Sequence, residues 1–453
     1  MKDVQGKIKR SGADIKEILT RLKKRDFSGY TGLAVKNSVY NTASTFVAKF
    51  GSLLFTIILA RLLMPELFGL YALALSTIMI FSTFSDLGVG QTIIKFISNS
   101  QSNRKSKSYF SYLFKIKIIL ILISATSLLI LSYPLAYYYF QKPIFYALLA
   151  GSLYLSMMSL EAVFKGLFHA RNNFKKTFYN EALFQFFRLT LVPLIVFLSI
   201  GYVRVEFLLL FIFLSLSFCF FLSFLYIFIS AMRKINFLKL KQEKLDKKEK
   251  KILNKFIIAL SAMTVSSTLF GHIDMLILGR YVGSEFIGFY RAAYSLIISA
   301  APLINFSGAL FPLFSRLNGN KSRRGLMRSL KLNLLMSVPL SILVISIAPI
   351  VVKIVYGSEY LPSINILRIF SILIIILPVI GLFSSYLISQ NKPARVAKSL
   401  IISTILNITL NYIFIISLLP YGYLPAVYGA AIATIISKFF YLGMLVWHKK
   451  ITS

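Results

Sequence analysis

The chain has 453 residues, of which 57% are hydrophobic and only 15% charged, and its mean hydropathy is +0.75. A soluble surface needs about a quarter of its residues to be charged, so this composition excludes a soluble enzyme and indicates an integral membrane protein. Lys and Arg outnumber Asp and Glu by 51 to 15, which gives a net charge of +36. Cys219 is the only cysteine and lies in an apolar run, which excludes a disulfide-stabilised secreted domain.

Continuous apolar runs recur along the chain, each long enough to cross a bilayer. A membrane-spanning helix needs about 20 mostly apolar residues. A membrane β-barrel would instead show segments of about ten residues with alternating hydrophobicity, whereas runs such as IFSILIIILPVI at 369–380 do not alternate. The sequence therefore predicts an all-α membrane protein with twelve transmembrane helices. They are expected at 38–60, 67–94, 112–133, 144–166, 181–199, 205–230, 254–278, 286–313, 332–352, 362–388, 398–417 and 425–447.

The basic residues are concentrated in every second connection between the predicted spans. Connections with clustered Lys and Arg face the cytoplasm, so the N-terminal segment 1–37, the linker 231–253 and the tail 448–453 are predicted to be cytoplasmic. The protein is then a multi-pass protein of the cell membrane. The positive charge marks topology and attracts anionic lipid, and we expect no nucleic-acid partner. The connections on the other side hold almost no basic residues: Arg61, Lys142, Arg204, Arg280 and Lys353, each alone.

The two halves of the chain repeat each other. The segment ARLLMPELFGLYALALS at 60–76 aligns without gaps onto GRYVGSEFIGFYRAAYS at 279–295, an offset of 219 residues. Six spans in each half give both halves the same orientation in the membrane. The sequence therefore predicts two parallel six-helix bundles, 38–230 and 254–447, joined by the basic linker 231–253. The matched pairs are Arg61 with Arg280, Glu66 with Glu285, Gly69 with Gly288, Tyr71 with Tyr290, Ala74 with Ala293, and Ser76 with Ser295.

Two parallel bundles favour a secondary transporter with a central cavity that opens alternately to each side of the membrane. The chain has no GxxxxGK[ST] motif for nucleotide phosphates. The outward connections are too short for an extracellular catalytic domain, so we expect a transporter rather than an enzyme, without a cofactor. No metal site is predicted either, because His169, His272 and His448 lie far apart in the sequence.

Cations inside the predicted spans are candidates for function, because a charge within the bilayer costs several kcal/mol unless it faces a cavity or a partner. Lys49 lies near the middle of the first span, and Arg188 lies about two turns into the fifth. Arg291 and Arg368 lie in the outer parts of the eighth and tenth spans. Such cations suit an anionic substrate with a phosphate or diphosphate group, because a guanidinium can bind two phosphate oxygens at once.

Three carboxylates within the spans, Asp86, Glu161 and Asp274, are the candidates for coupling transport to protons or Na⁺. Structural explanations stay open for these residues and for the cations. An ion pair of Lys49 with Asp86 or Glu161 would need no substrate. Residues near the end of a span can extend their charged groups to the lipid headgroups, which applies to Lys165, Asp274, Arg291 and Arg368.

Five stretches of the sequence resemble polysaccharide-biosynthesis flippases of the multidrug/oligosaccharidyl-lipid/polysaccharide exporter superfamily. The resemblance begins with RLLMPELFGLYALALSTIMIFSTFSDLGVGQTIIKFIS at 61–98 and extends over about 38–447. The other stretches are HIDMLILGRYVGSEFIGFYRAAYSL at 272–296, FPLFSRL at 311–317, YGSEYLPSINILRI at 356–369 and NITLNYIFIISLLPYGYLPAVYGAAIAT at 407–434.

This resemblance implies a V-shaped pair of six-helix bundles. It also implies a substrate, an oligosaccharide linked to polyprenyl phosphate or diphosphate, that moves from the inner to the outer leaflet for assembly of cell-surface polysaccharide. Relatives hold the phosphate with cavity cations, and by depth the matching candidates here are Lys49, Arg188, Arg291 and Arg368. The expected partners are the lipid-linked oligosaccharide, membrane lipids, and glycan polymerases or glycosyltransferases of the same pathway.

Three other functions remain as alternatives. Cation-coupled multidrug exporters of the same superfamily often carry an acidic residue in the first helix, where this chain has Lys49 and no carboxylate. Lipid-II flippases usually have about fourteen helices rather than the twelve predicted here. A membrane glycosyltransferase or polymerase would need an outward carboxylate beside a large outer loop; Asp274, Glu285 and Glu359 are predicted outward, but no such loop accompanies them.

Overall fold

The computed structural model describes residues 29–100, 102–301 and 320–450. The predicted basic segment up to residue 28, the predicted eighth span beyond residue 301 and the last three residues of the tail lie outside the described residues. Within the described part, ten helices are long and apolar enough to cross a membrane, and no β-strand occurs. The protein is therefore an all-α membrane protein, as the sequence predicts.

The described part of the first half forms five long helices and two short helical segments. Helix α2 contains the first predicted span and the second as far as Phe84, and the two are divided at Met64 (φ 58°, ψ 170°) and Pro65. The π-helical segment η1 continues α4. The elements are α2 (Gly29–Phe84), α3 (Val89–Ser98), α4 (Asn103–Tyr133), η1 (Pro134–Phe140), α5 (Phe145–Ala170), α6 (Phe174–Ser199) and α7 (Val205–Lys234).

The second half also consists of long helices with short helical segments between them. The tenth predicted span of the chain, 362–388, consists of two helices that meet near residue 371. The elements are η2 (Asn236–Lys239), α8 (Lys247–Tyr281), α9 (Ser284–Ala300), α11 (Asn320–Val355), η4 (Ser358–Tyr360), α12 (Ser363–Phe370), α13 (Leu373–Ser389), α14 (Pro393–Leu418), η5 (Leu419–Tyr421) and α15 (Tyr423–Lys450).

The second predicted span, 67–94, is not one helix. Helix α2 ends at Phe84, and α3 begins only at Val89. Between them Leu87 (φ 43°) and Gly88 (φ 86°) adopt left-handed backbone conformations, which stop the helix. A Cβ on Gly88 would also lie 2.5 Å from the Cβ of Leu260 on α8, so this close approach favours glycine. The continuous helix predicted from hydropathy was wrong here, because hydropathy does not detect a local change of backbone conformation.

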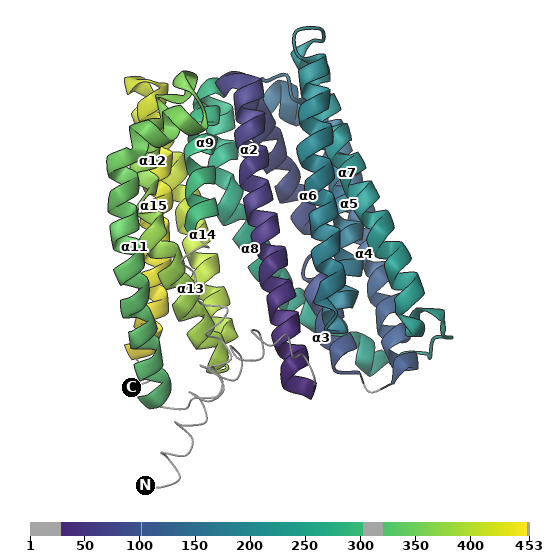
Figure 1. Cartoon of the computed structure of the whole chain (residues 1–453). Helices are drawn as coiled ribbons and strands as arrows, with labels where there is room; N and C mark the ends of the chain where they lie inside the picture. Colours follow the sequence, from purple (N-terminus) through teal and green to yellow (C-terminus); the bar gives the residue numbers. More distant parts are fainter. Residues whose placement is uncertain (1–28, 101, 302–319, 451–453) are drawn as a thin grey trace.

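The two halves share one hydrophobic core at one end of the molecule and have separate cores at the other. The shared core joins residues of both halves, such as Phe68 and Tyr71 of α2 with Tyr290 of α9. Toward the end that carries most Lys and Arg, which we call the basic end, one core contains Val89 and Phe164 of the first half, and another contains Val379 of the second. This arrangement is that of two helix bundles joined at one end, and Figure 1 shows the two groups of helices.

The joined end, opposite the basic end, is built from residues that the internal repeat makes equivalent. A Cβ on Gly69 would overlap the backbone carbonyl of Ser284, and a Cβ on Gly288 would overlap that of Pro65. Two further contacts cross between the halves there. Arg61 donates to the carbonyl oxygens of Ile354 and Val355 at the end of α11, and its repeat partner Arg280 donates to those of Tyr138 and Tyr139 at the end of η1.

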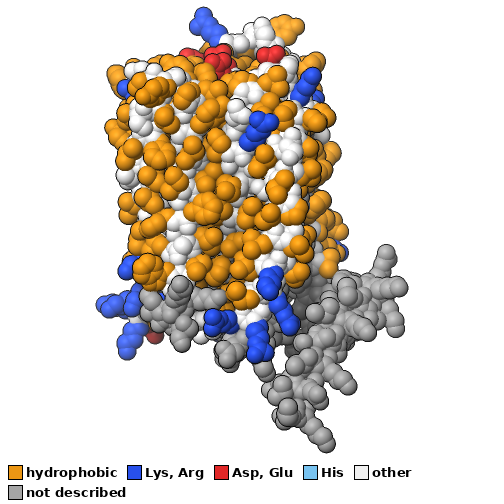
Figure 2. Space-filling view, turned by 90° about the vertical axis from the view of Figure 1, so that its left-hand side faces the viewer, with side chains coloured by type: hydrophobic (Ala, Val, Ile, Leu, Met, Phe, Trp, Pro, Cys, Tyr) orange, Lys and Arg blue, Asp and Glu red, His pale blue; other side chains and the backbone are white. Residues whose placement is uncertain are grey.

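Helix α8 connects the two halves. Its first turns pack on the first half, where Glu249 pairs with Lys105 and the ammonium of Lys95 lies 3.9 Å from the ring centre of Phe256. Farther along, α8 packs against α14 of the second half and against α2. Figure 2 shows the face of the second half with a wide band of apolar side chains and Lys and Arg below it, as a lipid-facing surface requires.

Candidate functional site

A buried carboxylate anchors a polar network inside the first half. Glu161 of α5 is 2% exposed. Its Oε1 atom accepts hydrogen bonds from Asn180 Nδ2 of α6 and Ser223 Oγ of α7, both at 2.5 Å. The ammonium of Lys165, one turn along α5, lies 3.0 Å from the same oxygen. Glu161 thus binds three helices together, and its charge is compensated by Lys165.

The network continues along α6. Lys165 also lies 3.0 Å from Oε2 of Glu181, so this lysine bridges two carboxylates. Gln185 Nε2 donates to Glu181 Oε1 at 2.8 Å, and Arg188 Nη2 donates to Gln185 Oε1 at 2.6 Å. Two residues that the sequence singled out separately, Glu161 and Arg188, are therefore the ends of one chain of contacts. Glu181, at the first residue of a predicted span, was missed as a site residue.

Arg188 is held between two aromatic rings with hydrogen-bonding capacity to spare. Its guanidinium carbon lies 4.6 Å from the ring centre of Phe55 on α2 and 5.1 Å from that of Phe184. These are cation–π contacts, which stabilise a cation without consuming its N–H donors. The Nε atom of Arg188 is buried and has no hydrogen-bond partner within residues 29–100, 102–301 and 320–450. The side chain is therefore fixed in place while some of its donors remain unused.

A second arginine approaches the same region from the other half. Arg291 of α9 is half-buried and, among the described residues, makes no hydrogen bond or ion pair. Arg188 and Arg291 both lie within electrostatic range of the hydroxyl of Tyr71. Tyr71 is buried where the halves share a core, with its ring stacked on Phe213. The structure thus brings one predicted cation from each half to the neighbourhood of one tyrosine.

Lys49 is placed on the exposed side of α2. Gly51, two residues farther along the helix, faces α6, and a Cβ there would lie 2.6 Å from Oε1 of Gln185. The exposed stripe around Lys49 also contains Phe46 and Phe50. In the part of the chain that the structure describes, Lys49 has no hydrogen-bond or ion-pair partner. The pairing with Asp86 or Glu161 considered from the sequence is wrong, because other lysines occupy both carboxylates. Helix α2 itself lies between the two groups of helices in Figure 1.

Asp86 is paired with a lysine that the sequence analysis missed. Lys117 of α4 is 1% exposed, and its Nζ lies 2.6 Å from Oδ1 of Asp86 in the break between α2 and α3. The backbone N–H of Gly90 donates to the same oxygen at 3.3 Å. The pair therefore fastens the broken helix to α4. Lys117 lies in the predicted span 112–133, so the rule that singled out Lys49 would have found it.

This pair predicts a double-mutant result. Asp86→Asn would leave the ammonium of Lys117 buried without a counter-charge, which should lower the stability of the protein by about 2 kcal/mol. The double variant Asp86→Asn/Lys117→Met removes the charge as well and should recover most of that loss. Thermal unfolding of the purified proteins in detergent would measure both variants. A double variant less stable than the single one would contradict the ion-pair explanation.

Asp274 is enclosed within the second half. Tyr290 donates its hydroxyl hydrogen to Asp274 Oδ2, and the N–H of Met275 donates to Oδ1 at 2.9 Å. Arg291 and Lys438 lie within electrostatic range of the carboxylate. Lys438 is a further intramembrane cation that the sequence analysis missed; its Nζ lies 3.5 Å from the ring centre of Phe270.

Arg368 lies apart from these groups on the exposed side of α12. It donates to Asn365 Oδ1 one turn away at 3.2 Å and to the carbonyl oxygen of Ile345 on α11 at 3.4 Å. Its environment is that of a side chain bound to neighbouring helices. No group of three or more His, Cys, Asp or Glu side chains that could hold a metal ion occurs in residues 29–100, 102–301 and 320–450.

Comparisons with known proteins agree with this architecture. The family model described as "Polysaccharide biosynthesis protein" matches residues 58–365, more than half of the chain. A curated relative, the teichuronic acid biosynthesis protein TuaB of Bacillus subtilis (strain 168), is 28% identical over 125 residues. That match covers 27% of this chain and 26% of the relative, so the chain spans about a quarter of the relative's length in the alignment.

Solved structures share the fold at low sequence identity. The lipid II flippase MurJ, in an inward closed conformation, superposes with a TM-score of 0.67 at 17% identity, over 89% of this chain and 86% of MurJ. An inward-facing multidrug resistance MATE family transporter of the MOP superfamily superposes with a TM-score of 0.68 at 14% identity, over 92% of this chain and 100% of the transporter. The fold is thus that of MOP superfamily transporters, two helix bundles in a V.

Proposed function

The chain belongs to the polysaccharide biosynthesis protein family, and from this premise we propose that it is a flippase for a saccharide linked to polyprenyl phosphate or diphosphate. The direction is from the inner to the outer leaflet, for assembly of cell-surface polysaccharide. The two predicted six-helix units, 38–230 and 254–447, are the parts that move against each other. The basic end, where the hydrophobic cores of the two halves are separate, faces the cytoplasm and receives the substrate.

The observation that carries the proposal is the position of Arg188. It is the terminal member of a network in which Lys165 is shared between Glu161 and Glu181, so these three residues carry one net negative charge and Arg188 balances it. Its buried Nε has no hydrogen-bond partner among the described residues, so part of the guanidinium remains available to a ligand. Arg291, from the other half, adds a second cation near Tyr71. Two cations from two halves suit a phosphate or diphosphate, because charge-assisted hydrogen bonds are strong and each guanidinium can bind two oxygens.

One further candidate fits the same transport path. Lys49, exposed on the helix between the halves, is the cation that an entering headgroup meets from the basic end. The polyprenyl tail stays in the bilayer while the headgroup moves between the halves. An inside-negative potential favours outward movement of anions by about 2.3 kcal/mol per charge per 100 mV. Rocking of one half against the other then exposes the headgroup on the other side.

We infer that the membrane potential, rather than a coupled ion, drives this movement. The three carboxylate candidates are all occupied by protein groups in this conformation. Asp86 is bound by Lys117, Glu161 by Lys165, and Asp274 by Tyr290. A Na⁺ ion binding there would have to displace an ammonium or a hydrogen-bonded hydroxyl. This disfavours the alternative of a cation-coupled multidrug exporter.

Liposomes that contain the purified protein and a polyprenyl-diphosphate-linked oligosaccharide test the function. An external glycosidase reports how much of the lipid becomes accessible with time, with and without an inside-negative potential. Exposure beyond the half already in the outer leaflet, faster with the potential, is the expected result. Efflux of small organic cations in response to an ion gradient, without exposure of the glycan, would instead identify a drug exporter.

Arg188→Gln should lower the rate of flipping in this assay at least about tenfold, because it removes charge-assisted hydrogen bonds of about 1.5–3 kcal/mol each. Arg368→Gln is the matched control: it removes the same charge from an exposed helix face and should change the rate by no more than about twofold. Size-exclusion profiles establish that both variants are folded. A folded Arg188→Gln protein that flips as fast as the unmodified protein would refute this role of Arg188.

A further inference from the structure

Two adjoining cavities lie at the basic end of the first half, away from the network that ends in Arg188. The larger has a volume of about 340 Å³ and is formed by the first turns of α6 and the last turns of α7. The smaller, of about 250 Å³, shares Asn173 and Lys234 with it and extends toward η2. The larger is lined by Asn173, Lys175, Lys176, Tyr179, Tyr226 and Lys234.

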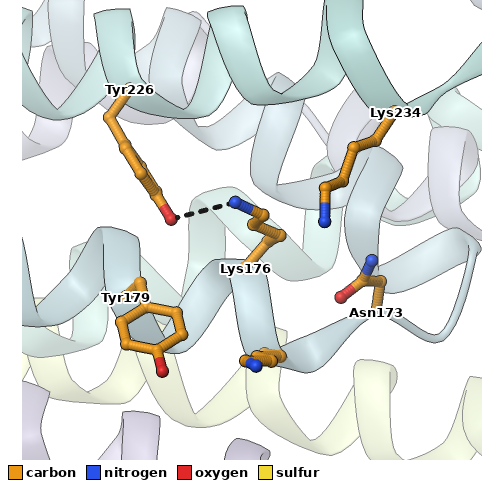
Figure 3. A pocket seen from close by; sticks show the side chains of 6 residues that line it. Asn173, Lys176, Tyr179, Tyr226 and Lys234 are labelled. Carbon is orange, nitrogen blue, oxygen red and sulfur yellow. Dashed lines mark hydrogen bonds between the residues drawn. The ribbon is translucent and has the colours of Figure 1, made fainter.

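The described residues that line both cavities include several cations and no carboxylate. Lys175, Lys176 and Lys234 line the larger, and Arg171 and the shared Lys234 line the smaller. Figure 3 shows Lys176 and Lys234 extending from opposite helices toward the same space, with Asn173 beside Lys234. Four like charges gathered around one space repel one another, and a bound anion would remove this repulsion.

The uncharged lining residues add suitable donors for a phosphate group. Lys176 Nζ lies 3.4 Å from the hydroxyl oxygen of Tyr226, to which it donates, so the hydroxyl can give its own hydrogen to an anion. Asn173, at the start of α6, makes no side-chain capping bond, and its amide is free to turn into the cavity. The positive end of the dipole of the 26-residue helix α6 also points at this space.

The position of the cavities indicates that the anion belongs to a membrane lipid. Farther toward the membrane centre, α6 and α7 expose apolar side chains, among them Phe186 and Phe218. Acyl or isoprenoid chains can lie on such a surface while their headgroup stays at the end of the helices. Tyr179 is also exposed there, and tyrosine is enriched at the level of lipid headgroups.

We propose that these two cavities form a binding site for the phosphate group of a membrane lipid. The phosphate lies between Lys176 and Lys234, Arg171 and Lys175 provide additional charge, and the hydrocarbon chains lie along α6 and α7. The site belongs to one half alone, so it does not depend on the proposed flipping path between the halves. A diacyl phospholipid and a polyprenyl diphosphate present the same headgroup chemistry to it.

Native mass spectrometry of the full-length protein in detergent tests the site by counting bound lipids. The probes are phosphatidylglycerol, polyprenyl diphosphate, diacylglycerol without phosphate, and inorganic phosphate. The test variant is Lys176→Gln/Lys234→Gln. The matched control is Lys239→Gln/Lys241→Gln, which removes two exposed lysines at the same end that line neither cavity.

The unmodified protein and the control should bind phosphatidylglycerol equally, and the test variant should bind it at least about tenfold more weakly, since each basic residue contributes about 1 kcal/mol at a membrane surface. Diacylglycerol should show no such difference. A parallel loss of polyprenyl diphosphate binding would mean that the site accepts either lipid phosphate. Equal binding of phosphatidylglycerol by all three proteins, or its displacement by an equimolar amount of inorganic phosphate, would overturn the proposal.

Discussion

Gly288→Leu should prevent the two halves from meeting at the end opposite the basic end. In the structure, even a single carbon added at Gly288 overlaps the backbone carbonyl of Pro65, and backbone cannot move aside as a flexible side chain can. Overpacking of this kind costs about 1–3 kcal/mol or more. A bias of about 3 kcal/mol would shift the population away from the joined arrangement about a hundredfold. Spin-label distances between Glu66 and Glu285, each replaced by cysteine, would measure the separation.

The internal repeat supplies a second test of the same contact. Gly69→Leu should have the same effect, because Gly69 approaches Ser284 as Gly288 approaches Pro65. Gly271→Leu, in α8, is the control, since no atom of the described residues lies within 4 Å of a Cβ there. Unchanged distances in both the Gly69 and Gly288 variants would mean that these glycines do not govern closure.

Removal of the contacts that Arg61 and Arg280 make with the opposite half should also shift the population away from the joined arrangement, without a steric clash. Arg61→Ala and Arg280→Ala each leave carbonyl oxygens at the end of a helix of the other half without their donor. The expected shift in distance distribution is smaller than that of the leucine variants. It should be similar for the two arginines, because they occupy equivalent positions in the repeat.

Glu161→Ala should destabilise the protein more than any other single removal of a charge in the polar network. The carboxylate accepts three hydrogen bonds or ion-pair contacts, from Asn180, Ser223 and Lys165. Its loss leaves the buried Asn180 Nδ2 without this acceptor, leaves Ser223 Oγ with only a 3.5 Å contact to the carbonyl oxygen of Asn180, and weakens the compensation of Lys165. Breaking a buried pair of this kind costs about 3–5 kcal/mol. The measurement is the midpoint of thermal unfolding in detergent, monitored by the loss of the monodisperse size-exclusion peak as the temperature rises.

Glu181→Ala is the matched control for Glu161→Ala. Both carboxylates pair with Lys165 at 3.0 Å, but the side chain of Glu181 is 14% exposed and that of Glu161 only 3%. Water can replace part of the hydrogen bonding that Glu181 provides, so Glu181→Ala should lower the stability of the protein by about 1 kcal/mol. A larger loss for Glu181→Ala than for Glu161→Ala would contradict the view that burial determines the cost.

The internal repeat in the sequence predicts the contact between the halves only in part. The match of Gly69 with Gly288 and of Arg61 with Arg280 indicates equivalent roles. It does not show that each residue contacts the opposite half, because an equivalent position within its own half would give the same pattern. The reciprocal contacts with Ser284 and Pro65 come from the folded arrangement.

The candidate site was predicted as a set of separate charges, and the structure shows how they are connected. Hydropathy identified Glu161 and Arg188 because charges are rare in apolar spans. It could not show that Lys165, Glu181 and Gln185 link them, since such contacts depend on how each helix is rotated about its axis. It also could not show that Asp86 lies in a helix break and pairs with Lys117.

The sequence by itself determined that this protein lies in a lipid bilayer, that it is all-α and that it has two parallel halves. Backbone polar groups have no water to bind within a bilayer, so long apolar runs form helices, and the basic connections predict their direction. Only the tertiary structure decided which end of the molecule has a shared core and which charges neutralise one another. Lipid is as apolar as a protein core, so the hydrophobicity of a span does not indicate which of its faces packs against another helix.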